Sequence, residues 1–231
     1  MRSNLFGTHG ETEGSHRMSL QNPRLSRVVL DGDEVLARQG SMVAYQGAIE
    51  FEFESTGGVK KLLKKALPGE KVPLMRCRGR GDLFLAHNPY ELHLIDLDGD
   101  SLTVNGANVL AYEPGLSWDI GKIEGASMLS GEVVTMVFTG TGRLVLAACG
   151  TPVVLDASQV PTYADVQSAI AWSSSLKTRL VRTAGAGALI GRGSGEAFQL
   201  AFEGQGFVVV QASDGPVVPK HNHDVVSEWL S

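Results

Sequence analysis

Three stretches decide the fold: GEKVPLMRCRGRGDLFLA at 69–86, GEVVTMVFTGTGRLVLA at 131–147 and GEAFQLAFEGQGFVVVQ at 195–211. Each begins with Gly-Glu, continues as an apolar-rich run, and passes through Gly-x-Gly into a second apolar run. Gly-x-Gly between two β-prone runs is typical of a sharp strand bend or a hairpin, because glycine tolerates positive φ and close backbone approach. The Gly-x-Gly positions lie 61 and 64 residues apart, which predicts an internal repeat.

The glycines and glutamates of these stretches form the structural repeat motif. Its members are Gly69, Glu70, Gly79, Gly81, Gly131, Glu132, Gly140, Gly142, Gly195, Glu196, Gly204 and Gly206. A second element alternates with it: Asp31-Gly32-Asp33 and Asp98-Gly99-Asp100 each precede alternating apolar residues, and Asp156 begins a degenerate third copy. Asp-Gly in this setting predicts a hairpin turn. A calcium loop is the weaker alternative, since the glycine comes too early for an EF-hand.

An aromatic residue occupies one position of this second element in each copy: Tyr45, Tyr112 and Trp172. The first two follow their Asp-Gly-Asp by the same 14 residues. A shared position favours packing in the core over a ligand site built on stacking.

Composition agrees with many short strands. The 231 residues include 28 Gly, 43% are hydrophobic, and only 19% are charged, with a net charge of −5. We predict an all-β protein in which three repeats of about 60 residues share one core over 25–212, because such short units rarely build separate cores. A disordered or loosely attached leader is expected at 1–24 and a polar tail at 213–231. Short links from each Gly-x-Gly run to the next hairpin element also predict closure, with the last strand near Gln211 pairing beside Arg27.

The segment VKKLLKKALP at 59–68 predicts one short amphipathic helix near 59–67, ended by Pro68-Gly69. Its polar face and the following strand form the basic cluster of the chain: Lys60, Lys61, Lys64, Lys65, Arg76, Arg78 and Arg80. A solvated helix face is the simplest interpretation. Partner or anion binding, to RNA, anionic lipid or an acidic protein, stays open, although the net charge of −5 disfavours broad nucleic-acid binding.

Patterns for chemistry are weak. The glycine-rich stretch 185–195 lacks phosphate-loop spacing, with Arg192 as the contact if an anion did bind, and His221 and His223 alone make a poor metal site. No nucleophile motif is present, so no catalytic residue, metal or cofactor is predicted. Cys77 and Cys149 are expected to be small core residues in a reducing cell, and the chain shows neither a secretory signal nor an apolar span, which favours the cytoplasm.

Several stretches resemble the bacterial members of the altered-inheritance-of-mitochondria twenty-four family. They are LDGDEVLARQGSMVAYQG at 30–47, LLKKALPGE at 62–70, LDGDSLTVNG at 97–106, LSWDI at 116–120 and ALIGRGSGEAFQLAF at 188–202. The resemblance implies a fold like that of the tryptophan RNA-binding attenuation protein (TRAP-like), as a pseudo-threefold β-sandwich or double-stranded β-helix. It also implies self-association, and no enzymatic reaction. The family's mitochondrial role does not carry over, because no Arg-rich, acid-poor transit segment is present.

These observations predict a non-enzymatic, self-assembling scaffold or binding module of the bacterial cytoplasm, with a homotrimer as the first estimate. An exposed strand edge has to be paired or covered, and self-association would do so. Two alternatives stay open: a ring that binds a small molecule or RNA, and a protein that binds a membrane surface or an acidic partner through the basic helix. An integral membrane protein is not expected.

Overall fold

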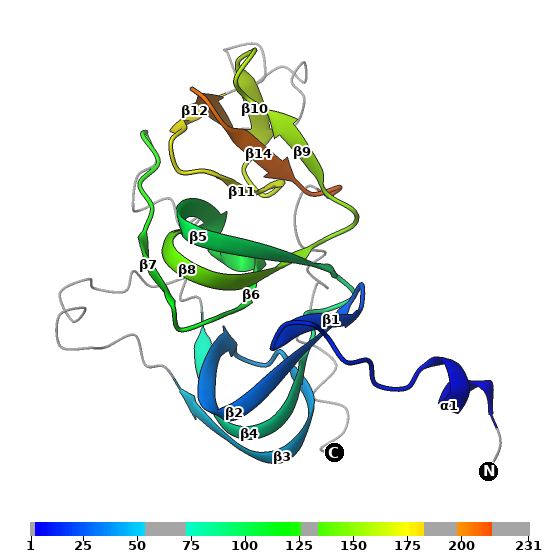
Figure 1. The fold of residues 1–231 in the computed structure, drawn as a ribbon. Helices are drawn as coiled ribbons and strands as arrows, with labels where there is room; N and C mark the ends of the chain where they lie inside the picture. Colours follow the sequence, from blue (N-terminus) through cyan, green and yellow to red (C-terminus); the bar gives the residue numbers. More distant parts are fainter. Residues whose placement is uncertain (1–2, 54–72, 126–133, 183–197, 214–231) are drawn as a thin grey trace, which may run out of the picture.

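Antiparallel strands make up most of the computed structural model, which describes residues 3–53, 73–125, 134–182 and 198–213 (Figure 1). A first unit contains β1 (Met18–Asn22), β2 (Leu25–Arg38), β3 (Met42–Phe53) and β4 (Leu74–Leu85). A second contains β5 (Glu91–Asn105), the 3₁₀ turn η1 (Gly106–Asn108), β6 (Val109–Tyr112), β7 (Leu116–Ile120) and β8 (Thr135–Ala148). A third contains β9 (Val153–Asp156), β10 (Thr162–Asp165), β11 (Ala169–Ser173), β12 (Lys177–Arg182), β13 (Phe198–Glu203) and β14 (Phe207–Val210).

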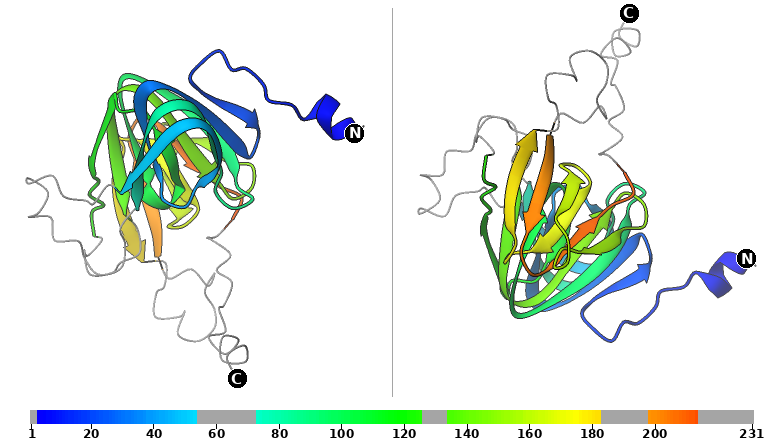
Figure 2. Two further views of the ribbon diagram at one scale, coloured as in Figure 1. Left: turned by 90° about the horizontal axis from the view of Figure 1, so that it is seen from below. Right: turned by 90° about the horizontal axis from the view of Figure 1, so that it is seen from above.

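The strands form two sheets. The larger has 11 strands in the order β3-β4-β2-β6-β8-β5-β11-β14-β9, with β1 added to β2 and β7 added to β8. The smaller has the order β10-β13-β12. The all-β prediction is therefore confirmed. The predicted helix at 59–67 lies outside the described residues, and the short helix that is described, α1 (Asn4–Thr8), extends away from the sheets in both views of Figure 2.

Gly-x-Gly bends the longest central strands. In β4, Gly79 and Gly81 have φ of 143° and 144°, and β4 pairs along its length with β2 on one edge and β3 on the other. A Cβ at Gly81 would lie 1.9 Å from the Gln46 carbonyl oxygen, so only glycine lets the backbones approach this closely. Both ends of β4 return to one turn: Gln39 N–H donates to Pro73 O at 2.8 Å, and Ala86 N–H donates to Ser41 O at 2.9 Å.

The Asp-Gly-Asp segments are not hairpin turns, so that prediction is wrong. Each lies inside a long strand as a β-bulge, with φ of 82° at Gly32 in β2 and 76° at Gly99 in β5. Each bulge stands opposite a Gly-x-Gly bend, so the extra residue lets the outer strand follow the curve of the inner one. In the third unit, Asp156 pairs with Phe207 and forms no such bulge.

The pairing register recurs from unit to unit. Tyr45 lies opposite Leu83, Tyr112 opposite Leu144, and Trp172 opposite Val208, which is in every case the residue two places after Gly-x-Gly. A one-residue register shift precedes each of these pairs. The third unit differs in that its Gly-x-Gly strand divides into β13 and β14. The pseudo-threefold, TRAP-like arrangement stays a prediction.

Predicted closure of the chain on itself is wrong. The last strand, β14, pairs with β9 and β11, and not with the first unit. The units are instead stacked, with β3 at the lower end and β10 at the upper end in Figure 1. Neighbouring units join through β2 with β6 and through β5 with β11.

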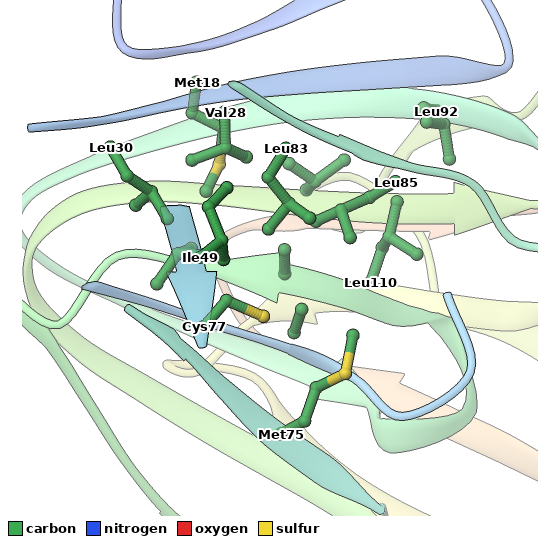
Figure 3. Close-up of a cluster of buried hydrophobic side chains, with 14 of the residues drawn as sticks. Met18, Val28, Leu30, Ile49, Met75, Cys77, Leu83, Leu85, Leu92 and Leu110 are labelled. Atoms are coloured by element: carbon green, nitrogen blue, oxygen red, sulfur yellow. The ribbon is translucent and has the colours of Figure 1, made fainter. Parts of the chain in front are cut away.

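Residues 18–22, assigned from sequence to the leader, form β1 and pair with β2. Met18 is fully buried, and its carbonyl oxygen accepts a bond of 2.8 Å from the Arg143 guanidinium of β8. Figure 3 shows Met18 beside Val28 and Leu83 in the first of three buried clusters. That cluster also includes Leu110 and Val145 of the second unit, so the first two units share core contacts across their junction.

We predict that Gly81→Ala destabilises the protein by clearly more than Gly99→Ala. Both positions have positive φ, which costs a residue with a Cβ about 1–2 kcal/mol. Only Gly81 also places its Cβ against backbone, whereas nothing lies within 4 Å of a Cβ at Gly99. Urea unfolding followed by circular dichroism measures both variants, and equal losses would show that the close approach is not what requires glycine in β4.

Candidate self-assembly surface

The first half of β3 is an exposed, uncharged strand edge. Within the part of the chain that the structure describes, β4 is its strand partner on one side and its other edge is unpaired. Every residue of β3 except Ile49 is exposed. Val43 and Tyr45 are 60% and 47% exposed, which is unusual for large apolar side chains next to each other on one strand.

The corresponding strands of the other two units are buried. Tyr112 in β6 and Trp172 in β11 are each 2% exposed, and both pack edge-to-face on a phenylalanine, Phe138 and Phe202 respectively. Core packing is therefore confirmed for Tyr112 and Trp172 and is wrong for Tyr45. The difference follows from strand pairing: β6 pairs with β2 and β11 pairs with β5 of the preceding unit, whereas β4 is the one partner of β3 among the described strands.

Charged side chains lie along the second half of β3 and along the corresponding strand of the third unit, β12, whose other edge is bonded to Glu124. The second half of β3 carries Glu50 and Glu52, and its counterpart β12 carries Lys177 and Arg179. Charged side chains on an edge oppose pairing with another strand. No residue from Met42 to Gln46 is itself charged, and at the end of the segment Gln46 Nε2 donates a bond of 2.6 Å to the carboxylate of Glu11.

The three described arginines of the predicted basic cluster alternate along β4 and lie among carboxylates. Arg76 is ion-paired with Glu34, Arg78 Nη2 lies 3.2 Å from the same carboxylate, and Arg80 Nε lies 3.5 Å from Asp31 Oδ1. Two carboxylates of β2 thus contact three arginines of β4. The four lysines of the cluster, Lys60, Lys61, Lys64 and Lys65, lie outside the described residues.

Six of the repeat-motif residues are described: Gly79, Gly81, Gly140, Gly142, Gly204 and Gly206. They act through the backbone, at the strand bends, and all have positive φ. The other six, Gly69, Glu70, Gly131, Glu132, Gly195 and Glu196, lie outside the described residues, as do Arg192, His221 and His223.

A half-buried polar group lies where the first unit meets the second. Arg38, at the end of β2, donates to the carbonyl oxygens of Gly106 at 2.8 Å, Ala107 at 2.6 Å and Val109 at 3.1 Å. Burial lowers the pKa of Arg38. Burial, and then the positive charge of Arg38, lower the pKa of His87 to about 4. These contacts hold the two units together, and sequence reasoning missed them because Arg38 carries no motif.

In the described part of the chain, a metal site would need several ligating side chains close together, and a reactive thiol would need a lowered pKa. No set of three His, Cys, Asp or Glu side chains is placed to hold a metal there. Burial raises the pKa of the Cys77 thiol to about 12, so Cys77 is not a thiolate nucleophile. A shallow depression of about 240 Å³ between Ala157–Pro161 and Phe202–Gln205 is open to solvent. No helix within the described residues is long and apolar enough to cross a bilayer.

Comparisons with known proteins agree with this architecture. Residues 17–213 match the family model described as mitochondrial biogenesis AIM24. An uncharacterised protein of Streptococcus pyogenes serotype M6 is 27% identical over 149 residues, which are 62% of this chain and 58% of that protein. The chain thus spans little more than half the length of this relative. A crystal structure of a Streptococcus pyogenes protein has a TM-score of 0.69 at 22% identity, covering 85% of this chain and 92% of the other, which shows a shared fold.

We predict that His87 makes the protein less stable as the pH falls from about 6.5 to about 4. Its folded pKa of about 4 lies below the ordinary value of 6.5, so the unfolded chain takes up the proton first. The loss is on the order of 1 kcal/mol, because His87 is only half buried. Urea unfolding at pH 7.5 and pH 5 should show a smaller loss for His87→Gln than for the wild type, with His9→Gln, at an exposed site, as the control. An unchanged difference would contradict the prediction.

Proposed function

The chain belongs to the family described as mitochondrial biogenesis AIM24, and from that premise we propose that it is a non-enzymatic scaffold that assembles with copies of itself. The observation that carries the proposal is the edge at Met42–Gln46, which is exposed although the corresponding strands of the same chain are paired and buried. This segment has no charged residue of its own and exposes Val43 and Tyr45, so a strand of another molecule could pair with it. Main-chain hydrogen bonds and cross-strand side-chain contacts would then supply the affinity.

The state of the titratable groups supports a role without catalysis. Arg38 is bonded to three carbonyl oxygens, and the Cys77 thiol is buried. Arg143 makes two bonds to the Asp96 carboxylate, at 2.6 and 2.7 Å, which hold the pKa of Asp96 below its ordinary value. Arg38, Arg143 and Asp96 thus link neighbouring strands, and Cys77 packs in the first buried cluster.

The ion pairs of the three described arginines favour the scaffold over RNA or lipid binding on β4. Arg76, Arg78 and Arg80 face Glu34 and Asp31, so binding a phosphate there would require breaking existing ion pairs. We place the scaffold in the cytoplasm, where the free thiols of Cys77 and Cys149 would stay reduced. Three copies are the first estimate of the assembly size.

The test is the mass of the untagged protein in solution, by native mass spectrometry and by light scattering at micromolar concentration. We expect a multiple of 24.6 kDa with no additional mass. Association through an apolar edge should persist in 1 M salt, which screens surface charges within about 3 Å. A monomer would overturn the proposal. A reproducible extra mass on every subunit would overturn it in favour of a ligand-binding protein.

A further inference from the structure

We propose that the assembly is head to tail: the first half of β3 in one copy pairs antiparallel with β10 of the next copy. In this pairing Ala44 lies opposite Ala164 and Tyr45 lies opposite Tyr163. The inference rests on the proposed self-association and goes beyond it, because it names both edges and their register.

The junction between the first and second units supplies the pattern. There β2 pairs with β6 so that Ala37 lies opposite Ala111 and Leu36 lies opposite Tyr112. On its other edge, Leu36 lies opposite Arg76, the residue three places before the first glycine of Gly79-Arg80-Gly81. The junction therefore pairs two defined positions. One is the residue opposite the third residue before Gly-x-Gly, here Leu36, and the other is the aromatic residue, here Tyr112.

The junction between the second and third units uses the same two positions in the same register. In β5, Thr103 lies opposite Trp172 of β11, and Val104 lies opposite Ala171. Thr103 also lies opposite Val137, which again is three places before the first glycine of its Gly-x-Gly. Two independent junctions of the chain thus follow one rule.

At each end of the stack, one of these two positions has no partner on its second side among the described strands. Tyr45 in β3 holds the aromatic position and follows Ala44, as Tyr112 follows Ala111. Tyr163 in β10 holds the other position, since it lies opposite Ala201, three places before Gly204. By this rule the β3 edge at Tyr45 pairs with a β10 edge at Tyr163, and neither edge pairs with another copy of itself.

The exposure of Tyr45 and Tyr163, and the places of β3 and β10 in the stack, support a second copy of the chain as the partner. The side chains used at the two junctions are at most 7% exposed, whereas Tyr45 and Tyr163 are 47% and 55% exposed. In Figure 1, β3 and β10 lie at opposite ends of the stack, so the two edges of one chain do not meet. A second copy brings the missing edge, and its units would continue the stacking already present between units of one chain.

A contact between two different edges is heterologous. Such contacts close into a ring when the rotation between copies allows it and otherwise continue as a filament. A closed ring of three copies would satisfy every β3 and every β10, in agreement with the trimer expected as the first estimate.

The first experiment mixes two variants that each block one edge, Tyr45→Lys and Tyr163→Lys. Both side chains are exposed in the single chain, so folding should be preserved, and circular dichroism checks it. Each variant alone should associate at least about tenfold more weakly than the wild type, because an unpaired lysine would be buried in the contact. The mixture retains one intact pair of edges and should form a one-to-one dimer that grows no further.

The outcomes separate this inference from the proposed function. A monomeric wild type would overturn self-association itself. An associating wild type together with a Tyr163→Lys variant that associates equally well would overturn only the head-to-tail contact, and would point to pairing of two β3 edges or to the β9 edge. A mixture that stays monomeric would overturn it as well.

A second experiment tests the register by disulfide cross-linking in a Cys149→Ser background. Opposite residues in antiparallel strands have Cβ atoms about 4.5–5.5 Å apart, close enough for a disulfide after a small shift. Ala44→Cys mixed with Ala164→Cys should cross-link on mild oxidation. Ala48→Cys, exposed on the charged half of β3, should not cross-link with Ala164→Cys. Efficient linking of Ala44→Cys to itself, or no link in the mixture, would overturn the proposed pairing.

Discussion

The close backbone approach at Gly-x-Gly is the constraint on which the rest of the structure depends. At Gly81 the space that a Cβ would need is taken by the Gln46 carbonyl oxygen. With glycine there, β4 curves until both of its ends meet the turn at 39–41. A straight strand of the same sequence would separate those ends, and the turn could not bond to Pro73 and Ala86 together.

The curve also determines how units join. Because β4 and β8 bend, the long strands beside them bend too, and the Asp-Gly-Asp bulges supply the extra residue that the outer path requires. The later part of each outer strand then turns toward the next unit, where β2 meets β6 and β5 meets β11. Arg38 reinforces the first of these junctions through the carbonyl oxygens of residues 106, 107 and 109.

Sequence alone predicted the features that have a local cause. Gly-x-Gly indicated bends, and the six described glycines of this motif lie at them with positive φ. It failed where the same local signal serves two geometries or where the cause is distant. Asp-Gly suits a hairpin turn and a bulge equally well, and only the strand opposite decides between them. Closure depends on the rotation between units, which no short motif encodes. The exposure of Tyr45 depends on β3 being the terminal strand of the described sheet, which its own sequence does not encode.

The strand edges at the ends of the stack differ in how they are covered. Repeat proteins commonly cover their terminal units with polar capping elements. Among the described residues, β1 covers an edge in this way, because it pairs with the early part of β2 and Met18 is buried there. The chain also places Glu50 and Glu52 along the second half of β3. Neither device extends to Met42–Gln46, although the same chain pairs and buries the corresponding strands β6 and β11. The apolar edge at Met42–Gln46 therefore has no partner on its second side among the described strands, and this is the ground for proposing a strand from a second copy there.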